Sequence, residues 1–105
     1  DTVCMACWLS AIAGGALKST ATQPTPGGWN PPNTGATNSS GFTAGPGGLR
    51  SHDGNFNYLG LDGYWWSSSS SGSDAWNLHL YYNNGSILRD GNNPGFGLSV
   101  RCLRD

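Results

Sequence analysis

Gly95-Phe-Gly-Leu-Ser-Val-Arg-Cys-Leu-Arg-Asp105 is the stretch of sequence from which we predict the fold. Its apolar positions alternate with smaller or more polar ones: Phe96, Leu98, Val100 and Cys102. An apolar side chain at every second position is typical of a β-strand with one buried face. We therefore predict that this strand lies at the centre of a small sheet, with Cys102 on its buried side.

The other two cysteines, Cys4 and Cys7, lie near the opposite end of the sequence. They are about one helical turn apart, so either could face Cys102, and the spacing leaves the choice open. We expect a disulfide between Cys102 and either Cys4 or Cys7, worth about 4.5 kcal/mol by the chain-entropy model. A zinc site with His52 and His79 is the weaker reading, since only one pair has metal-like spacing. No metal and no cofactor is predicted.

The composition predicts one domain, residues 1–105, with a polar and nearly neutral surface. Lys and Arg number five, Asp and Glu six, and the net charge is −1. Such a chain lacks a basic footprint for nucleic acid, and no apolar run is long enough for membrane insertion. A disulfide and a Ser-, Thr- and Asn-rich surface favour an extracellular or cell-surface location.

Residues 1–18 are predicted to form an N-terminal helix. Its apolar residues recur at helical spacing: Met5, Trp8, Leu9 and Ile12. Gly14-Gly15 is expected to end or loosen this helix. Residues 19–48 are rich in Pro and Gly and show no periodicity, which predicts a long irregular loop segment. Trp29 and Phe42 are its expected anchors in the core.

Residues 49–105 are predicted to form a β-meander. Turn signals occur at Asp53-Gly54 and at Asn83-Asn84-Gly85. The serine-rich run Ser67–Ser73 is expected to be a flexible loop. The cleanest predicted strand is Ala75–Tyr82, with two distinct faces. One face carries Trp76, Leu78, Leu80 and Tyr82, and the other carries Asn77, His79 and Tyr81.

A series of motifs in fixed order resembles the Fibrobacter succinogenes major paralogous domain. The motifs are Leu17-Lys-Ser-Thr20, Gly41-Phe42, Pro46-Gly-Gly-Leu-Arg50, Asp53-Gly-Asn-Phe56, Gly63-Tyr-Trp-Trp-Ser-Ser-Ser69, Tyr81-Tyr-Asn-Asn84 and Gly97–Asp105. The resemblance covers roughly Gly14 to Asp105. It implies an α+β fold similar to the C-type-lectin-like fold of the formylglycine-generating-enzyme group, with a small antiparallel sheet and long Gly/Pro/Ser/Asn-rich loops. It also implies a secreted or surface protein of bacteria.

The family pattern usually begins well before the Leu-Lys-Ser-Thr motif, so the resemblance implies an N-terminally truncated domain. A missing first strand would leave an apolar strand edge open beside the last strand, and open edges pair with other chains. Our leading hypothesis is therefore a non-catalytic structural or adhesive subunit of an extracellular assembly or fibre, with copies of itself as partners. As an alternative, Asp1–Trp8 itself supplies the pairing segment.

A second hypothesis is a monomeric lectin-like module that binds glycan or protein through aromatic loops. Its candidate binding residues are Trp66, His79 and Tyr81, the last two expected to be exposed. No catalytic residue is predicted, because the aspartates sit in turn sequences and the serine run lacks the context of a nucleophile. The family's formylglycine-generating relatives use cysteine chemistry, which no residue here matches.

Glycosylation has three candidate positions in the sequence. Asn38-Ser-Ser40 and Asn84-Gly-Ser86 are N-glycosylation sequons, and Thr2 lies in a segment that could accept an O-glycan. The sequon is a short pattern of low specificity, and both asparagines also fit simple turns.

Overall fold

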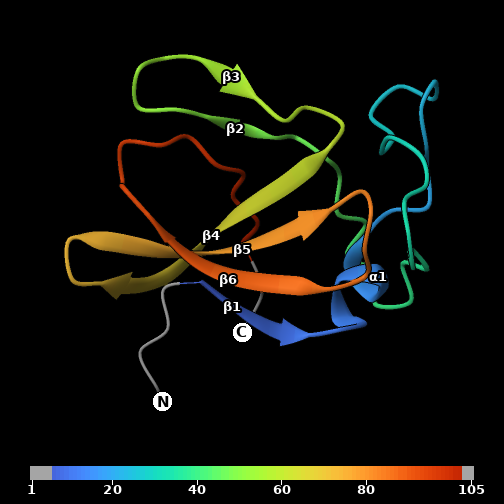
Figure 1. Ribbon diagram of the computed structural model, residues 1–105, viewed down its shortest axis with the longest axis horizontal. Helices are drawn as coiled ribbons and strands as arrows, with labels where there is room; N and C mark the ends of the chain where they lie inside the picture. Colours follow the sequence, from blue (N-terminus) through green and yellow to red (C-terminus); the bar gives the residue numbers. More distant parts are fainter. Residues whose placement is uncertain (1–5, 103–105) are drawn as a thin grey trace.

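The computed structural model describes residues 6–102, except for the side chains of residues 6–10 and 69–71. The described residues form a four-stranded antiparallel sheet in the order β1-β6-β5-β4 and a separate two-stranded ribbon, β2–β3 (Figure 1). The elements are β1 (Ala6–Ser10), α1 (Ala13–Leu17), β2 (Leu49–Arg50), β3 (Phe56–Asn57), β4 (Asp62–Ser71), β5 (Asp74–Tyr81) and β6 (Ile87–Asn92). This is a nearly all-β chain, so the predicted α+β, C-type-lectin-like fold is wrong.

The predicted N-terminal helix over residues 1–18 is wrong for residues 6–10, and only Ala13–Leu17 is helical in the part that the structure describes. Residues 6–10 form β1, which pairs with β6 so that Trp8 lies opposite Leu88. Met5, the first residue of the expected helical face, lies outside the described residues. A short apolar run fits a strand as well as a helix. Here residues 6–10 form a strand because they pair with the edge of β6. This agrees with the alternative that Asp1–Trp8 supplies a pairing segment.

The only helix among the described residues, α1, is five residues long. It contains Gly14 and Gly15, the pair that was expected to end or loosen the longer predicted helix. A Cβ atom on Gly14 would collide with the backbone of Ser86, and one on Gly15 with the backbone of Gly35. The two glycines therefore let α1 pack directly against the β5–β6 turn and the loop segment, which gather at one end of the sheet (Figure 1).

The terminal stretch that was predicted to be the central strand is instead a border of the sheet. Ser99 accepts a hydrogen bond from Trp66 N and donates one to Tyr64 O, both 3.1 Å, and so covers part of the outer edge of β4. Val100 is 70% exposed, and Cys102 is exposed and carries a free thiol. Alternation is typical of an extended chain and does not fix its place in a sheet, and here β5 and β6 are the central strands.

The predicted disulfide partners of Cys102 cannot be placed beside it. Cys4 lies outside the described residues, and the side chain of Cys7 is not described. No disulfide joins Cys102 to a described residue, and its expected burial is wrong. The pairing itself stays a prediction.

The serine-rich run is part of a strand and not a loop. β4 continues to Ser71, and β5 pairs with it up to Asp74 across a turn at residues 72–73. This pairing uses backbone hydrogen bonds alone. Small polar residues can therefore extend β4 and β5 beyond the hydrophobic core. The register shifts between Trp66 and Ser70, where the extension begins.

The core lies on the face of β5 that was predicted to be apolar. Leu80 and Ile87 pack with Trp29 and Ala44 from the irregular segment, which contains no helix or strand between Leu17 and Leu49. Trp29 is fully buried and donates its indole N–H to Ala44 O at 2.9 Å, which confirms it as an anchor.

A buried lysine explains the Leu-Lys-Ser-Thr motif. Lys18 is 0% exposed, and its ammonium donates to the carbonyls of Thr34, Tyr81 and Asn84 at 2.7–3.0 Å. The three bonds tie the end of α1 to the irregular segment and to both sides of the β5–β6 turn. Burial lowers the pKa of Lys18 to about 8, whereas the three carbonyls favour the protonated form.

In the part of the chain that the structure describes, no helix has the length and apolar character needed to cross a membrane.

Candidate functional site

The polar face of β5 lies beneath the β2–β3 ribbon, and a cavity of about 290 Å³ opens between them. Antiparallel pairing places Tyr64 of β4 and Leu88 of β6 on either side of His79. We call this cavity the tyrosine pocket. Its lining consists of Leu49, Ser51, Asn57, Tyr58, Tyr64, His79, Tyr81, Leu88, Asp90, Asn92 and Phe96.

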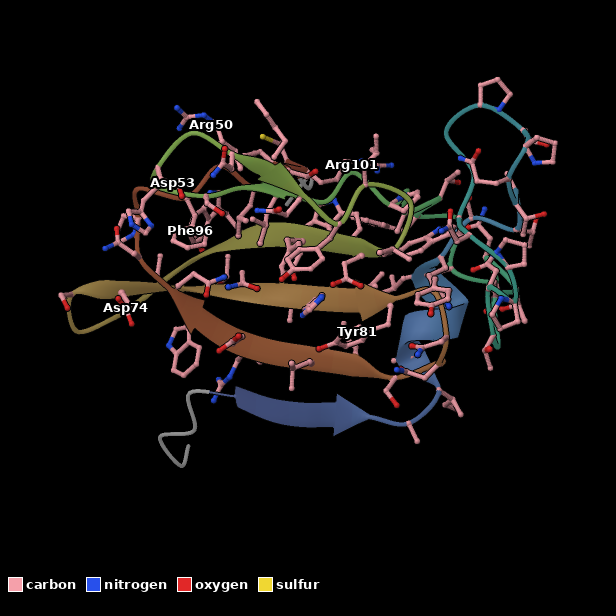
Figure 2. All side chains as sticks on the ribbon, turned by 45° about the horizontal axis from the view of Figure 1, so that its top comes forward. Arg50, Asp53, Asp74, Tyr81, Phe96 and Arg101 are labelled. Atoms are coloured by element: carbon pink, nitrogen blue, oxygen red, sulfur yellow. The ribbon has the colours of Figure 1, made fainter. Side chains whose placement is uncertain are left out.

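Three rings form a stacked row along the floor of the tyrosine pocket. The centroids of Tyr64 and His79 are 3.9 Å apart with the rings 24° from parallel, and those of His79 and Tyr81 are 4.0 Å apart. Tyr58 lies 6.5 Å from Tyr64 at an angle of 45° and adds a side wall. Tyr81 on β5 and Phe96 after β6 both line the cavity (Figure 2). Both faces of His79 are therefore covered by the tyrosines, and one face of each tyrosine is turned away from the row.

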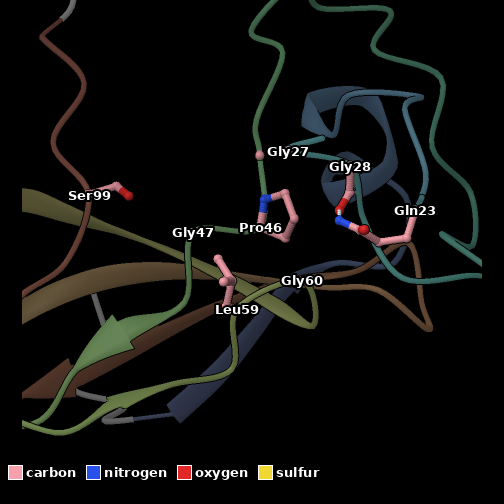
Figure 3. Close-up of a pocket in the computed structure, with 9 residues that line it drawn as sticks. Gln23, Gly27, Gly28, Pro46, Gly47, Leu59, Gly60 and Ser99 are labelled. Atoms are coloured by element: carbon pink, nitrogen blue, oxygen red, sulfur yellow. Dashed lines mark hydrogen bonds between the residues drawn. The ribbon is translucent and has the colours of Figure 1, made fainter. Parts of the chain in front are cut away.

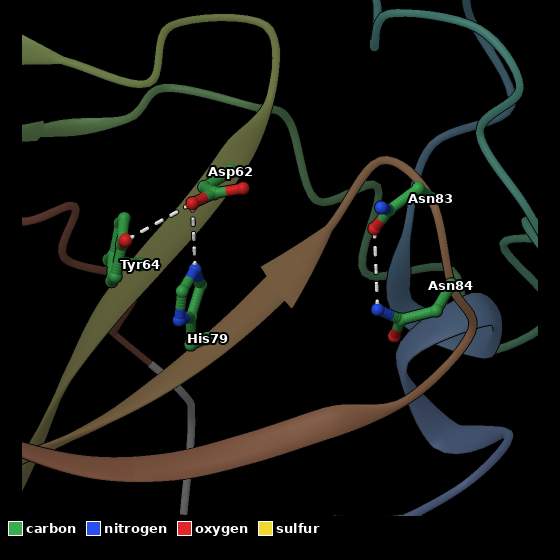
Figure 4. Close-up of polar contacts among 5 residues, drawn as sticks. All are labelled: Asp62, Tyr64, His79, Asn83 and Asn84. Carbon is green, nitrogen blue, oxygen red and sulfur yellow. Dashed lines mark hydrogen bonds and ion pairs between the residues drawn. The ribbon is translucent and has the colours of Figure 1, made fainter.

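A carboxylate fixes two of these rings from one side (Figure 4). Asp62 Oδ2 accepts a hydrogen bond from the Tyr64 hydroxyl at 3.2 Å and lies 3.1 Å from His79 Nε2. The imidazole contact is at ion-pair distance but lacks hydrogen-bond geometry. Both side chains are nearly buried, at 8% exposed for His79 and 13% for Asp62. The arrangement holds the rings in place and brings a negative charge to the floor.

The pKa values of Tyr64 and Tyr81 are both raised in the tyrosine pocket. The pKa of Tyr81 is raised to about 12, mainly by burial and to a smaller extent by the charges of Asp62 and Asp90. Burial also raises the pKa of Tyr64, with the neighbouring charge of Asp62 as the second cause. Both phenols stay protonated at neutral pH, so each keeps a hydroxyl donor.

Asn77 lies on the same face of β5 as His79 and Tyr81, outside the tyrosine pocket. Its side chain is 0% exposed, and neither its amide nitrogen nor its oxygen has a hydrogen-bond partner among the described residues. It lies opposite Trp66 on β4 and Asp90 on β6. Buried amides are rarely left unpaired, because each lost hydrogen bond costs about 1–3 kcal/mol. The side-chain amide of Asn77 is thus buried without hydrogen-bond partners among the described residues.

The model of one protein family, described as the Fibrobacter succinogenes major domain, matches residues 3–104. The chain belongs to this family. The match begins eleven residues before Gly14, where the motif resemblance begins. No curated protein and no solved structure matches the chain. Membership of the major-domain family suggests a surface or structural module.

The two predicted binding residues on β5 lie together in this major-domain chain, but one is more buried than predicted. His79 is 6% exposed, so the expectation that it lies at the surface is wrong, and Tyr81 is half-buried beside it. Trp66 is half-buried on the same face of the sheet by register and does not line the tyrosine pocket.

Sequence reasoning missed Asp62, Tyr58 and Asp90 as members of the site. Asp62-Gly63 reads as a turn signal, yet Asp62 begins β4 and lies opposite Tyr81. The signal that could have found it is its spacing of two from Tyr64, which puts both side chains on one face of a strand. Asp90 follows Leu88 by the same spacing.

A larger cavity of about 380 Å³ lies on the other side of the ribbon's base (Figure 3). Its walls are mostly backbone, with five glycines, Pro46 and Leu59, and with Gln23 and Ser99 at opposite ends. Gln23 already donates to Gly28 O at 2.8 Å. Few side chains with recognisable chemistry converge there, so we take the tyrosine pocket as the candidate site.

The tyrosine pocket offers binding groups more than reactive ones. Ser51 lines it together with His79, but the Ser51 hydroxyl is hydrogen-bonded to Asn57 Nδ2 at 3.1 Å. His79 is stacked between two tyrosines. Among the side chains that the structure describes, no group of three or more His, Cys, Asp or Glu could hold a metal ion.

Both sequon asparagines take part in turns. The side-chain nitrogen of Asn38 donates to Thr43 Oγ1 at 2.9 Å, and that of Asn84 lies 3.4 Å from Asn83 Oδ1 (Figure 4). Asn84 also accepts from Ser86 N at 2.9 Å. Thr2 lies outside the described residues. Glycosylation at these three positions stays a prediction.

Proposed function

We propose that this domain is a non-catalytic module of a secreted or surface protein, and that it binds a sugar ring in the tyrosine pocket. The observation that carries the proposal is the stacked row of Tyr64, His79 and Tyr81 at the floor of a cavity. This favours the second of our two hypotheses, the lectin-like binding module, over assembly.

The aromatic floor suits the apolar face of a sugar. The C–H groups on one side of a pyranose ring form a flat apolar surface, and the face of a tyrosine that is turned away from His79 supplies a matching flat surface with little entropy to lose. A cavity of about 290 Å³ is close to the lower end of the common range for ligand sites, about 300–1,000 Å³. The size therefore favours one or two sugar units.

The rim supplies hydrogen-bonding groups for the hydroxyls of such a ring. Asp90 and Asn92 come from β6, and Asn57 and Ser51 come from the ribbon on the opposite side. These side chains are half-buried or exposed and can exchange water for a ligand. A few placed polar groups around an apolar floor are typical of small-molecule sites.

The absence of catalysis is part of the proposal. An acid–base pair for hydrolysis needs two groups free to act on opposite sides of a bond. Here Asp62 contacts both Tyr64 and His79, and so serves to position rings. Incubation of the domain with the sugars it binds should release no product, and release of one would contradict this part.

The test is a glycan array followed by titration calorimetry on the best sugar, with two matched variants. Tyr81→Ala removes a ring of the floor and should weaken binding about fivefold to tenfold, the equivalent of a lost stacking contact of about 1–1.5 kcal/mol. Trp66→Ala removes an aromatic ring from the same sheet face outside the pocket and should bind as the unaltered protein does.

Circular dichroism of both variants verifies that they fold. The proposal fails if the unaltered domain binds no sugar, or if folded Tyr81→Ala binds as tightly as the unaltered domain. Loss of binding in Trp66→Ala alone would move the site to the far part of the sheet.

Assembly through a strand edge remains a second candidate, with a different edge from the one expected. β1 is an edge strand, and among the described residues no strand pairs with its outer side. The opposite edge, along β4, is partly covered by Gly48 and Ser99. A short apolar edge strand is a template for addition of a strand from a second copy, as in an adhesive fibre.

Analytical ultracentrifugation over a wide concentration range tests this second candidate. Ala6→Lys places a charge on β1, and charged edges resist pairing. Oligomers that are present in the unaltered protein and absent in Ala6→Lys are expected. A monomer at all concentrations would rule out assembly by the isolated domain.

A further inference from the structure

The tyrosine pocket brings two carboxylates close to one cavity, and His79 lies at ion-pair distance from only one of them, Asp62. Asp90 lines the pocket, and Asp62 lies under its floor against Tyr64 and His79. Asp90 Oδ1 accepts a backbone hydrogen bond from Gly91 N at 2.8 Å. No Lys or Arg side chain is among the described residues that line the cavity.

The basic side chains of the described chain are engaged elsewhere. Lys18 is buried at the end of α1, and Arg89 stacks on the Trp76 ring at 4.2 Å on the opposite face of the sheet. Arg101 stacks on Phe42 at 4.4 Å, and Arg50 lies on the exposed side of β2. The charge of Asp90 is thus left for a ligand to neutralise.

The rings of the pocket add to this preference for a cation. Tyr58, Tyr64, Tyr81 and Phe96 present four aromatic rings to one cavity. The face of an aromatic ring carries partial negative charge and attracts an ammonium group within about 6 Å of its centre. Burial and, after it, the charges of Asp62 and Asp90 raise the pKa of the Tyr81 hydroxyl, so Tyr81 stays neutral beside a cation.

We infer that the ligand of the tyrosine pocket carries a positive charge, and that the sugar it takes is an amino sugar with a free ammonium group. The ammonium would lie near Asp90, while the pyranose face stacks on the face of Tyr81 that is turned away from His79. This inference rests on the proposed function and deepens it, since it names the chemical class of the sugar.

The experiment compares two probes of the same length, a β-1,4-linked glucosamine oligomer and its N-acetylated counterpart. The two differ in charge at the nitrogen, so their affinities separate recognition of charge from recognition of the ring. Tetramethylammonium is the third probe, a cation with no sugar. Titration at low and high salt completes the set, because an attraction that depends on charge weakens as salt is added.

Two matched variants locate the charge. Asp90→Asn removes the charge at the pocket and keeps an oxygen for Gly91 N, and Asp74→Asn removes the same charge at the far turn of β5. The amine oligomer should bind at least about tenfold more tightly than its acetylated counterpart, as one charge contact of about 1.4 kcal/mol gives. Asp90→Asn should remove this preference, and Asp74→Asn should retain it.

The outcomes separate this inference from the proposed function. Equal affinity for both oligomers overturns the inference and leaves sugar binding intact. If tetramethylammonium binds and neither oligomer does, the pocket is a cation site and the proposal that it binds a sugar is overturned. No binding of any probe overturns both. An equal loss of preference in Asp74→Asn and Asp90→Asn overturns the inference, because net charge would then explain the preference without a site.

Discussion

The two faces of β5 show what decides the role of a sheet residue. Leu78 and Leu80 contact the hydrophobic core, whereas His79 and Tyr81, their neighbours in the chain, line the tyrosine pocket. Leu80 and His79 are both buried, at 1% and 6% exposed. Burial is therefore nearly equal on the two faces, and the difference lies in what covers each. The irregular segment covers one with apolar side chains, and the ribbon covers the other loosely.

The largest expected effect separates the faces by stability. Leu80→Ala leaves a cavity in the core and should lower the free energy of unfolding by about 2–5 kcal/mol. Tyr81→Phe removes only a hydroxyl from the pocket face and should lower it by about 1 kcal/mol. Urea denaturation of both variants measures this. Equal losses would mean that the pocket face is as tightly packed as the core.

An intermediate effect uses pH to probe the pocket face alone. The pKa of Tyr81 is raised to about 12, above the value of about 10 for an unfolded tyrosine, so its contribution to stability is full below pH 10 and lost as pH rises. The urea midpoint should fall between about pH 10.5 and 12, and by less in Tyr81→Phe. Lys18, with its pKa lowered to about 8, acts mainly below that interval and with the opposite sign.

If the unaltered protein and Tyr81→Phe lose stability in parallel over this interval, Tyr81 is not shielded as the structure implies. Absorbance of phenolate near 295 nm, followed on the folded protein, provides the control. The Tyr81 hydroxyl should resist ionisation until about pH 12.

The smallest effect is expected where neither face is covered. Ser67 and Ser68 are neighbours on β4, point to opposite faces and are both exposed. Thr has a higher strand propensity, so Ser67→Thr and Ser68→Thr should each change stability by less than about 0.5 kcal/mol, and by similar amounts. A clear difference between them in thermal denaturation would show that one face of the extension is covered after all.

Much of the sheet could be predicted from the sequence because its periodicity is local. The alternation of β5 is confirmed, as are the turns at Asp53-Gly54 and Asn83-Asn84-Gly85. Strand order could not be predicted. It depends on which segments compete for the same edge, and the alternation of residues 96–102 gives no information about this. The helical pattern before Gly14 failed for the same reason, since β6 offered an edge to Trp8 and its neighbours.

The candidate site was predicted only in part. His79 and Tyr81 were found from their shared strand face, but Tyr58 and Phe96 reach the pocket from segments far away in sequence. A register between β4 and β5 is needed to bring Asp62 opposite Tyr81. That register follows from pairing in three dimensions, which no local pattern contains.

The position of Lys18 has a practical consequence. It is the only lysine in the chain, and its amine is enclosed by three carbonyls. Reagents that acylate lysine should leave this side chain unlabelled in the native protein and label it once the chain unfolds. Labelling at one atom thus reports global unfolding, and a crosslinker that targets amines would find no lysine through which to attach this domain to a neighbour.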